Sequence, residues 1–427
     1  MRPQPKTPPP VEKRPDPDFI TQERKYELIT PLFGGGVEPA TADPVTIIRG
    51  TGIRGQLRFW WRACRGGQFN GDLAAMKEAE DALWGAASTE ARPRPSQVQI
   101  HVEISHAGKP FVAKDGVPIG QPKSRYGYVA FPLNDKPENT VQEGVKFVLT
   151  ISYPRVMEDK KESRRDTQAE VEAALWAWET FGGVGARTRR GFGALCRADV
   201  KLPVKPEEVE KLIRQGLEQH VTDGQWPKNV PHLMRQSQFK VTALSQDGLA
   251  AWQYLIKALK DFRQDRPWND KTKRPGRSRW PEPEAIRKRT GQRLPAHALL
   301  PTQIDRFPRA VFGLPIIFQF KDQDRSNPTN PHKDPRQTTL QGANNRDRLA
   351  SPLILRPFLC AGDKGVGLAL ILAGPRVPLE ELTLKGAPDR RPIESSLTRA
   401  EAKQIPMLDG ETDVLHAFLK TLRGEQP

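Results

Sequence analysis

The chain has few cysteines, and no two of them lie close together. Cys64, Cys196 and Cys360 are more than 100 residues apart and form no CxxC or CxxH pair. Structural zinc sites draw their ligands from such short spacings, and no acidic cluster with metal-ligand spacing replaces them. We therefore expect no metal and no cofactor. Unpaired thiols also fit a reducing compartment, which predicts a cytoplasmic protein.

Long apolar runs are also absent. No run approaches the roughly 18 residues of a membrane span, so we expect no membrane partner. The N-terminal stretch MRPQPKTPPPVEKRPDPD is rich in proline and charge and has no apolar segment of a secretory signal. We interpret residues 1–20 as a disordered arm.

Positive charge, by contrast, is in excess. The 427 residues include 67 Lys and Arg against 51 Asp and Glu, which gives a net charge of +16. A balance of this kind favours a polyanionic partner, and without a membrane signal that partner is expected to be a nucleic acid. The length suits two domains rather than one.

The first half alternates strand and helix patterns, and we place the first domain at 21–230. The order of strand, helix, strands, helix and strand is that of a ferredoxin-like unit, so the predicted fold class is α+β. The clearest predicted elements are helices over 52–65 and 167–181 and strands within 96–105, 145–153 and 192–202.

The second half, 231–427, repeats this mixture with two polar inserts. The insert at 266–293 holds ten basic and three acidic residues, whereas the one at 321–347 is nearly neutral at its start and is expected to be a flexible loop. The predicted elements are a strand at 237–244, a helix at 249–262, strands at 313–320, 351–360 and 365–374, and a closing helix at 412–422.

A glycine-rich loop, GGVGARTRRGFGAL at 182–195, follows the second helix. Phosphate loops of nucleotide-binding proteins follow a strand and precede a helix, and here the order is reversed. We predict that Gly182 or Gly183 is a left-handed helix cap. The remaining glycines would let a nucleic-acid backbone approach Arg187, Arg189 and Arg190, although a mobile turn with solvated arginines explains the same pattern.

A second basic motif, RGTGIRGQLRFWWRACR at 49–65, contains no acidic residue. On a helix, Ile53, Leu57, Trp60 and Cys64 share one stripe. Arg54, Arg58, Arg62 and Arg65 share another, roughly 115° away. A row of like charges repels itself unless a polyanion neutralises it, which favours RNA or DNA contact.

The tryptophan pair of this motif allows two interpretations. Trp60 lies in the middle of the apolar stripe and is expected in the core. Trp61 lies at its edge, where it either packs in the core or stacks on a base.

Together these motifs resemble the RAMP superfamily of CRISPR-associated proteins. The similarity is carried by TPLFGGG at 30–36, IRGQLRFWWR at 53–62, LWG at 83–85, the glycine loop and RLASPLILRP at 348–357, which point to the first subunit of type III-B Cmr effector complexes. Glycine stands at position 52 where serine is common in the family, and the basic insert has no counterpart that we can place.

The resemblance implies two ferredoxin-like, RRM-related domains and a non-catalytic subunit that caps one end of a guide–target RNA assembly in antiviral defence. Its partners would be single-stranded RNA, as guide or target, and the other subunits of the complex. The residues that the resemblance places against RNA are Arg49, Arg54, Arg58, Arg62, Gly183, Gly185, Arg187, Arg189, Arg190 and Gly191.

Two alternatives remain open at this point. A guide-processing endoribonuclease of the same superfamily would need a general acid and base, for which His101 and His106 are the nearest pair; on a regular strand they face opposite sides. We expect neither to be catalytic. A free-standing RNA-binding protein without CRISPR partners is the other alternative.

Overall fold

The structure is a computed structural model. It describes residues 18–34, 46–87, 94–113, 116–133, 141–155, 166–271, 273–295, 304–343, 348–377, 381–388 and 391–422. Most of the arm predicted at 1–20 lies outside these residues. Its end was placed too late, because Phe19 already begins the first strand. No helix within the described ranges is long and apolar enough to cross a membrane.

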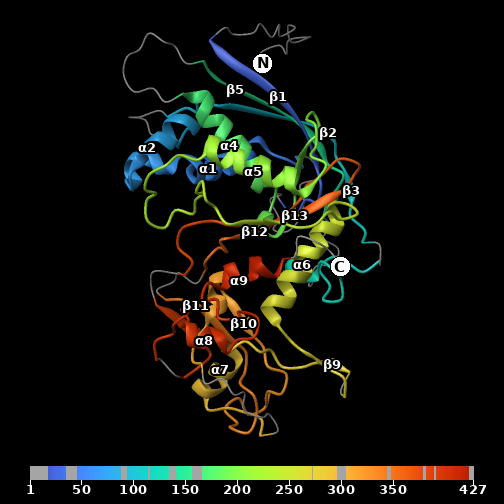
Figure 1. Ribbon diagram of the computed structural model, residues 1–427, viewed down its shortest axis with the longest axis vertical. Coiled ribbons are helices and arrows are strands. Elements are labelled where there is room, and N and C mark those ends of the chain that lie inside the picture. Colours follow the sequence, from blue (N-terminus) through green and yellow to red (C-terminus); the bar gives the residue numbers. More distant parts are fainter. Residues whose placement is uncertain are drawn as a thin grey trace, which may run out of the picture.

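The first layer of the molecule is a four-stranded antiparallel sheet. Its strands are β1 (Phe19–Leu28), β2 (Gln99–His106), β5 (Lys146–Pro154) and β6 (Leu195–Arg197), in the order β2-β5-β1-β6. Two helices, α1 (Gly50–Arg65) and α4 (Thr167–Phe181), cover one face of this sheet (Figure 1). The predicted bounds of α4 are confirmed, and α1 begins two residues earlier than predicted.

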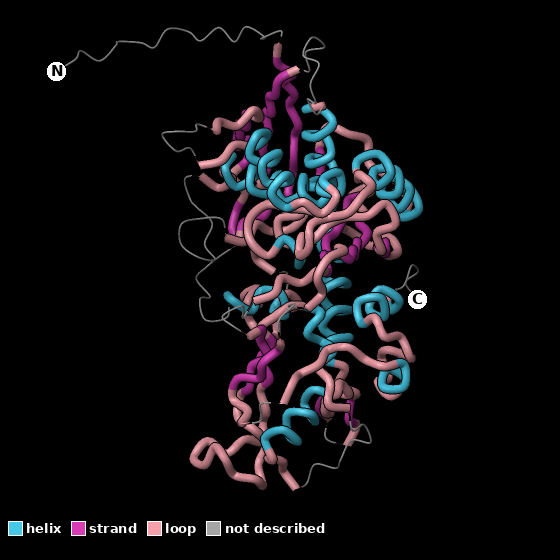
Figure 2. Tube along the Cα trace, turned by 90° about the vertical axis from the view of Figure 1, so that its left-hand side faces the viewer, coloured by secondary structure: helices cyan, strands magenta, loops and turns pink. Residues whose placement is uncertain are grey.

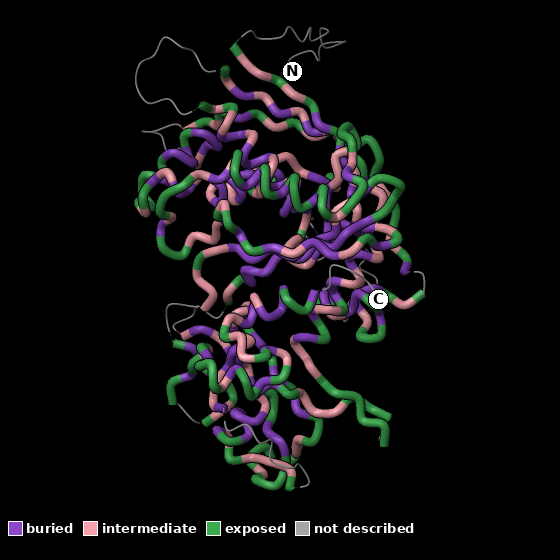
Figure 3. The backbone as a smooth tube through the Cα atoms, in the orientation of Figure 1, coloured by how far each residue is buried: buried purple, intermediate pink, exposed green. Residues whose placement is uncertain are grey.

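A second sheet lies on the other side of these helices. It consists of β7 (Phe239–Val241), β12 (Leu353–Leu359) and β13 (Gly365–Ile371), in the order β12-β13-β7. Its far face packs on α6 (Gly248–Gln264), α8 (Arg399–Lys403) and α9 (Val414–Thr421). Every residue of β13 is buried, so the layers run sheet, helices, sheet, helices (Figure 3).

One hydrophobic core joins the two halves of the chain. It contains Leu57 of α1 and Trp178 of α4 together with Ile354 of β12 and Leu368 of β13. The helix α5 (Pro206–His220) packs beside α4 and contributes to the same core. The division at 230/231 remains a prediction, but the packing on its two sides is continuous.

A third group of elements forms the end of the molecule farthest from the first sheet. It contains the strands β10 (Ile316–Phe318), β11 (Thr338–Gly342) and β14 (Leu382–Lys385) and the helix α7 (Glu282–Thr290), around a core of its own. Loops make up much of this end (Figure 2). The strand predicted at 313–320 corresponds to β10. It thus lies in a different sheet from the strands predicted at 351–360 and 365–374, which correspond to β12 and β13.

Within the insert at 321–347, the stretch 321–337 expected to be a flexible loop forms no named helix or strand, and β11 begins directly after it. Asp334 of this stretch nevertheless forms a buried two-point ion pair with Arg287 of α7, at 2.9 Å for both contacts. The smaller elements are α2 (Leu73–Trp84), α3 (Gly127–Ala130), β3 (Lys109–Pro110), β4 (Gln142–Glu143), β8 (Trp268–Asn269) and β9 (Arg274–Pro275).

Two predictions around the glycine loop are wrong. The strand expected over 192–202 is reduced to Leu195–Arg197, because the φ of +59° at Gly193 delays its start and a turn at Ala198 ends it. Val200, which lies beyond that turn, is 43% exposed. Gly182 ends α4 with a φ of −91° and is therefore not a left-handed cap.

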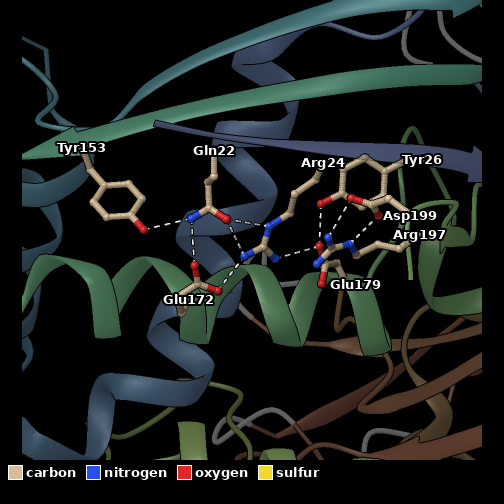
Figure 4. A network of polar contacts seen from close by, with 8 residues as sticks. All are labelled: Gln22, Arg24, Tyr26, Tyr153, Glu172, Glu179, Arg197 and Asp199. Atoms are coloured by element: carbon tan, nitrogen blue, oxygen red, sulfur yellow. Dashed lines mark hydrogen bonds and ion pairs between the residues drawn. The ribbon is translucent and has the colours of Figure 1, made fainter. Parts of the chain in front are cut away.

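A polar network fastens β1 to α4 inside the first layer (Figure 4). Arg24 of β1 donates to Glu172 at 2.5 Å and to Glu179 at 2.9 Å, and the hydroxyl of Tyr26 donates to Glu179 at 2.5 Å. Burial raises the pKa of Tyr26, and Glu179 raises it further, so the phenol stays a donor. The network thereby fixes the register between the sheet and the helix that leads into the glycine loop.

A buried arginine holds the two halves together at the end of α4. Arg356 of β12 is 0% exposed and donates to the carbonyl oxygens of Glu179 at 2.6 Å, Gly182 at 3.1 Å and Leu195 at 2.6 Å. A cation is favourable here because the last carbonyls of a helix carry partial negative charge. Burial nevertheless lowers the pKa of Arg356 to about 10.

We expect Arg356→Ala to lower the free energy of unfolding by about 3–5 kcal/mol, because buried carbonyls lose their charged donor. Urea unfolding followed by circular dichroism measures the change. Lys257→Ala is the control: its ion pair with Asp261 is exposed, and the change should stay within about 0.5 kcal/mol. A similar small effect for both variants would contradict the role given to Arg356.

Candidate nucleic-acid interface

The apolar stripe predicted for α1 is confirmed. Ile53, Leu57, Trp60 and Cys64 are all at most 2% exposed. Trp61 is 1% exposed, and its indole nitrogen donates to the carboxylate of Glu170 at 2.5 Å. Neither tryptophan of the pair is therefore available to stack on a base.

The sequence suggested that the arginine row of α1 needs a polyanion to neutralise it, but carboxylates of the same chain pair with three of its four arginines. Arg58 donates to Glu80 at 2.6 Å and to Asp81 at 3.1 Å, and Arg62 donates to Glu80 at 2.5 Å. Glu80 and Asp81 are 2% and 5% exposed. At the end of the row, Arg65 pairs with Glu170 at 2.9 Å. Self-repulsion within the row is thus relieved inside the chain and no longer requires a polyanion.

Both carboxylates that neutralise Arg58 lie on α2, a helix that the sequence reasoning missed. Its signals were present in the sequence. Asp72 is an N-cap whose side chain accepts from Ala74 and Ala75, and buried Met76, Ala79 and Leu83 recur at helical spacing.

The first turn of α1 remains electropositive. Its N-cap is Arg49, without a side-chain cap, and its first turn holds no acidic residue. The N–H groups of this turn therefore lack intrahelical acceptors, and the helix dipole adds partial positive charge. Arg54 lies one turn further on, with a buried Nε for which the described residues supply no hydrogen-bond acceptor.

Two glycines leave the surface of this turn open. A Cβ on Gly52 or Gly55 would meet no atom within 4 Å. Glycine inside a helix costs about 1 kcal/mol relative to alanine, and nothing packed in the described part of the chain accounts for that cost here. The open surface admits the backbone of a ligand to the helix.

The glycines of the loop have the opposite explanation. A Cβ on Gly183 would lie 2.7 Å from the carbonyl oxygen of Gly193, and one on Gly191 would lie 2.4 Å from the indole nitrogen of Trp252. Gly185 has a φ of +79° and would press on Leu32 at 2.7 Å. The sequence reasoning assigned these glycines to the approach of a polyanion, but close packing within the chain already requires them.

The arginines of the loop reach toward both halves of the molecule. Arg189 donates to the carbonyl oxygen of Ser351 at 2.5 Å and lies 5.4 Å from the ring of Phe59 on α1. Arg190 donates to the carbonyl oxygen of Leu353 at 3.0 Å. The structure thus brings the loop against α1, so that the two basic motifs form one region.

Arg263, near the end of α6, completes this region. We call Arg187, Arg189, Arg190 and Arg263 the arginine cluster. Burial, together with repulsion from Arg263, Arg187 and Arg189, lowers the pKa of Arg190 to about 9. No carboxylate within the described part of the chain pairs with any of the four, in contrast to Arg58 and Arg62.

Two members of the arginine cluster also have a side-chain nitrogen without a hydrogen-bond acceptor among the residues described. Arg187 lies 4.8 Å from the ring of Phe131, and Arg263 lies 5.3 Å from the ring of Phe312. The Nε of each is buried and has no acceptor among the residues described. A bound anion would supply those acceptors and the missing negative charge.

The open face of the first sheet is a poorer candidate. The aromatic side chains Tyr26, Phe147 and Tyr153 are buried under α4, and the exposed positions of β1 include Glu23 and Lys25. Stacking of unpaired bases needs exposed rings, and on this face β1, β2 and β5 present no exposed phenylalanine, tyrosine or tryptophan, only the imidazoles of His101 and His106.

The two histidines of β2 lie on one face, not on opposite faces. A bulge between Ile104 and His106 shifts the register, so that His101 pairs with Thr150 and His106 with Lys146. Four residues of β5 separate those partners, or roughly 13 Å of strand. No group of three or more metal-ligating side chains occurs among the residues that the structure describes.

Residues 25–196 match the RAMP superfamily. This match confirms the resemblance drawn from the arginine helix and the glycine loop, and it covers α1, α4, β2 and β5 in full and parts of β1 and β6.

The particular relatives come from Pyrococcus furiosus. The chain is 27% identical to CRISPR system Cmr subunit Cmr1-2 over 178 residues, which are 40% of this chain and 90% of that protein. It is 30% identical to subunit Cmr1-1 over 153 residues, which are 35% of this chain and 40% of that protein.

Solved structures give weaker likenesses. The crystal structure of apo Cmr1 from Pyrococcus furiosus has a TM-score of 0.46 at 17% identity, covering 86% of this chain and 94% of that one. A chain in the cryo-EM structure of the type III-B Cmr-beta complex bound to cognate target RNA has a TM-score of 0.46 at 13% identity, covering 94% and 100%. The mixed α+β class that the sequence predicts is confirmed by the helices and strands of the chain itself.

We expect Arg58→Ala to lower the free energy of unfolding by about 1–3 kcal/mol, because Glu80 and Asp81 lose a buried partner while Arg62 remains. Chemical unfolding of Arg58→Ala, Glu80→Ala and the double variant measures the coupling. Additive effects of the two single changes would show that the ion pair contributes nothing to stability.

Proposed function

We propose that the chain is an RNA-binding subunit of a type III-B CRISPR effector complex. The observation that carries the proposal is the arginine cluster, a set of four cations for which the described residues provide no carboxylate. The relatives, by their names, are subunits of Cmr systems, which supports the assignment to an effector complex.

The ligand would be the sugar-phosphate backbone of single-stranded RNA. Arginine forks match phosphate oxygens, and a phosphate beside Arg190 would remove the repulsion that lowers its pKa. The first turn of α1 would receive a second phosphate, because it combines free N–H groups, the helix dipole and an open glycine surface.

The predicted RNA contacts divide on this view into three kinds. Arg54, Arg187, Arg189 and Arg190 would contact phosphate directly, as would Arg49, the N-cap of α1. Arg58 and Arg62 stay paired to α2 and would contribute long-range attraction only. Gly183, Gly185 and Gly191 would shape the loop rather than contact RNA.

We further propose that the chain binds RNA without cleaving it. His101 and His106, the pair considered for acid–base chemistry, are exposed and too far apart to act on one phosphate. Target cleavage and guide processing would then belong to other subunits of a cytoplasmic antiviral complex, with this chain at one end of the guide–target assembly. An endoribonuclease would be recognised by turnover that His101→Ala or His106→Ala abolishes.

We also propose a ferredoxin-like fold for both units. The order β2-β5-β1-β6 with α1 and α4 on one face supports it for the first unit. In the second unit β7, α6, β12 and β13 follow one another in the same manner, and no fourth strand joins them among the described residues.

We expect Arg187→Ala to weaken binding of single-stranded RNA by a similar factor for unrelated sequences, because phosphate contacts carry no base information. The slope of log affinity against log salt should fall by about 0.7. Fluorescence anisotropy at several salt concentrations measures both. Arg197→Ala is the matched control, since that arginine is paired to Asp199 at 2.8 Å. Equal losses for the two variants, or none, would refute the assignment of the cluster.

Two substitutions at Gly55 distinguish an effect on stability from an effect on RNA binding. Gly55→Ala should raise the free energy of unfolding by about 0.5–1 kcal/mol, because the position is helical and open. Gly55→Gln should instead weaken RNA binding, because its side chain occupies the surface that the backbone of RNA would use. Ala400→Gln adds the same bulk to an exposed position of α8 and should leave binding unchanged. Unchanged RNA affinity in Gly55→Gln would exclude this surface as a contact.

A further inference from the structure

The basic insert at 266–293 consists of two parts with different roles. In its second part, the arginines of α7 are used inside the protein: Arg287 pairs with Asp334 at 2.9 Å, and Arg289 pairs with Asp305 at 2.7 Å. Arg293 pairs with Glu284. These cations hold the third core together and are not available to a ligand.

The first part of the insert forms a small hairpin that leaves the body of the molecule. Its strands β8 and β9 pair through Trp268 with Pro275 and Asn269 with Arg274. All residues of both strands are exposed, and the hairpin projects from the end of α6 into solvent (Figures 1 and 3).

The base of this hairpin is held firmly. Arg279 donates to both carboxylate oxygens of Asp265, at 2.6 and 2.7 Å, and its backbone N–H donates to the carbonyl oxygen of the same residue at 3.1 Å. The N–H of Gly276 donates to the carbonyl oxygen of Pro267 at 2.7 Å. The hairpin is therefore fixed where it leaves the core, although no core packs around its strands.

Its cations differ from those of α7. Arg266, Lys271, Lys273 and Arg274 are exposed, and none forms an ion pair with any residue in the described part of the chain. The one acidic residue of the hairpin, Asp270, is exposed as well, so four cations against one carboxylate leave the segment positively charged. An anionic ligand would relieve the remaining repulsion.

The two tryptophans of the insert have opposite environments. Trp280 is 0% exposed, and its indole nitrogen donates to the carbonyl oxygen of Phe262 at 2.8 Å. Trp268, twelve residues earlier, is 59% exposed. A large ring left in water among unpaired cations is the combination by which proteins bind single-stranded nucleic acid, with bases stacking on the ring and phosphates meeting the cations.

The hairpin also continues directly from the arginine cluster. Arg263 of the cluster lies near the end of α6, and Arg266 begins the hairpin three residues later. A strand of RNA that leaves the cluster would pass two carboxylates at this end of α6, and both are already paired: Asp261 with Lys257, and the C-cap Asp265 with Arg279.

We propose that Trp268 is a base-stacking residue for single-stranded RNA and that the hairpin's four cations bind the adjoining phosphates. This inference rests on the proposed function and extends it to a site that contacts bases. The arginine cluster contacts phosphates, whereas Trp268 would contact the π-face of a base irrespective of its identity.

The test uses the full chain and two probes, a labelled oligouridine and a ribose-phosphate oligomer of the same length without bases. Trp268→Ala should weaken oligouridine binding about 5- to 100-fold and leave binding of the abasic oligomer unchanged, because only the first probe can stack. Trp268→Phe should restore most of the affinity. The salt dependence should stay that of the wild type in both variants, since no phosphate contact is lost.

Charge variants separate the two kinds of contact. Lys273→Ala and Arg274→Ala should each lower the slope of log affinity against log salt by about 0.7 and weaken binding of the two probes by a similar factor. Ile317→Ala is the control for an exposed apolar side chain outside the hairpin, at 56% exposure, and should leave binding of both probes unchanged. Thermal unfolding of Trp268→Ala should match the wild type, because the ring packs in no core.

Three outcomes would overturn the inference. In the first, Trp268→Ala binds oligouridine as tightly as the wild type, whereas Arg187→Ala binds it more weakly; the inference then fails and the proposed function stands. Both probes could lose affinity equally, so that no base is stacked. Trp268→Ala could bind RNA normally but fail to assemble with partner subunits, which makes the hairpin a protein contact. If the wild-type chain binds neither probe, the proposed function fails with it.

Discussion

The bond between Arg356 and the end of α4 is the constraint on which the arrangement of the rest depends. One guanidinium binds carbonyl oxygens of Glu179, Gly182 and Leu195, and so joins the second sheet to the helix and to the last strand of the first sheet. The glycine loop runs between two of these three residues. Its arginines can therefore be presented in a fixed place although the loop itself is rich in glycine and contains few regular hydrogen bonds.

The helical spacing of apolar residues was sufficient to predict those features that depend only on residues close together in the sequence. The bounds of α4 and the buried stripe of α1 followed from apolar residues at helical spacing, since a helix must bury one face. The strand predicted over 192–202 was too long because Gly193, with a positive φ, delays its start and a turn at Ala198 ends it, although the apolar pattern looks continuous. The arginine row failed for a different reason: its partners Glu80 and Asp81 lie about 20 residues away, on a helix that was not predicted.

The glycines show most clearly where sequence reasoning stops. Gly183, Gly185 and Gly191 are needed because other parts of the same chain come too close for a side chain, whereas Gly52 and Gly55 touch nothing. Both kinds of position are occupied by glycine, so the sequence does not distinguish them. Only the positions of the neighbouring atoms distinguish a glycine that packs from one that leaves space for a ligand. Likewise, Trp268 and Trp280 could not be told apart until their surroundings were known.

The second sheet has a consequence for how the protein is made. It covers α1 and α4, yet β13 ends 174 residues beyond the end of β6, because an insert with its own core stands between α6 and β12. At about 5–20 residues per second, a ribosome needs roughly 10–35 s to supply the second sheet after the first unit has emerged. During that time the apolar surface that later packs on the second sheet faces water. The nascent chain therefore passes through a long interval in which this surface is open to aggregation or to chaperone binding.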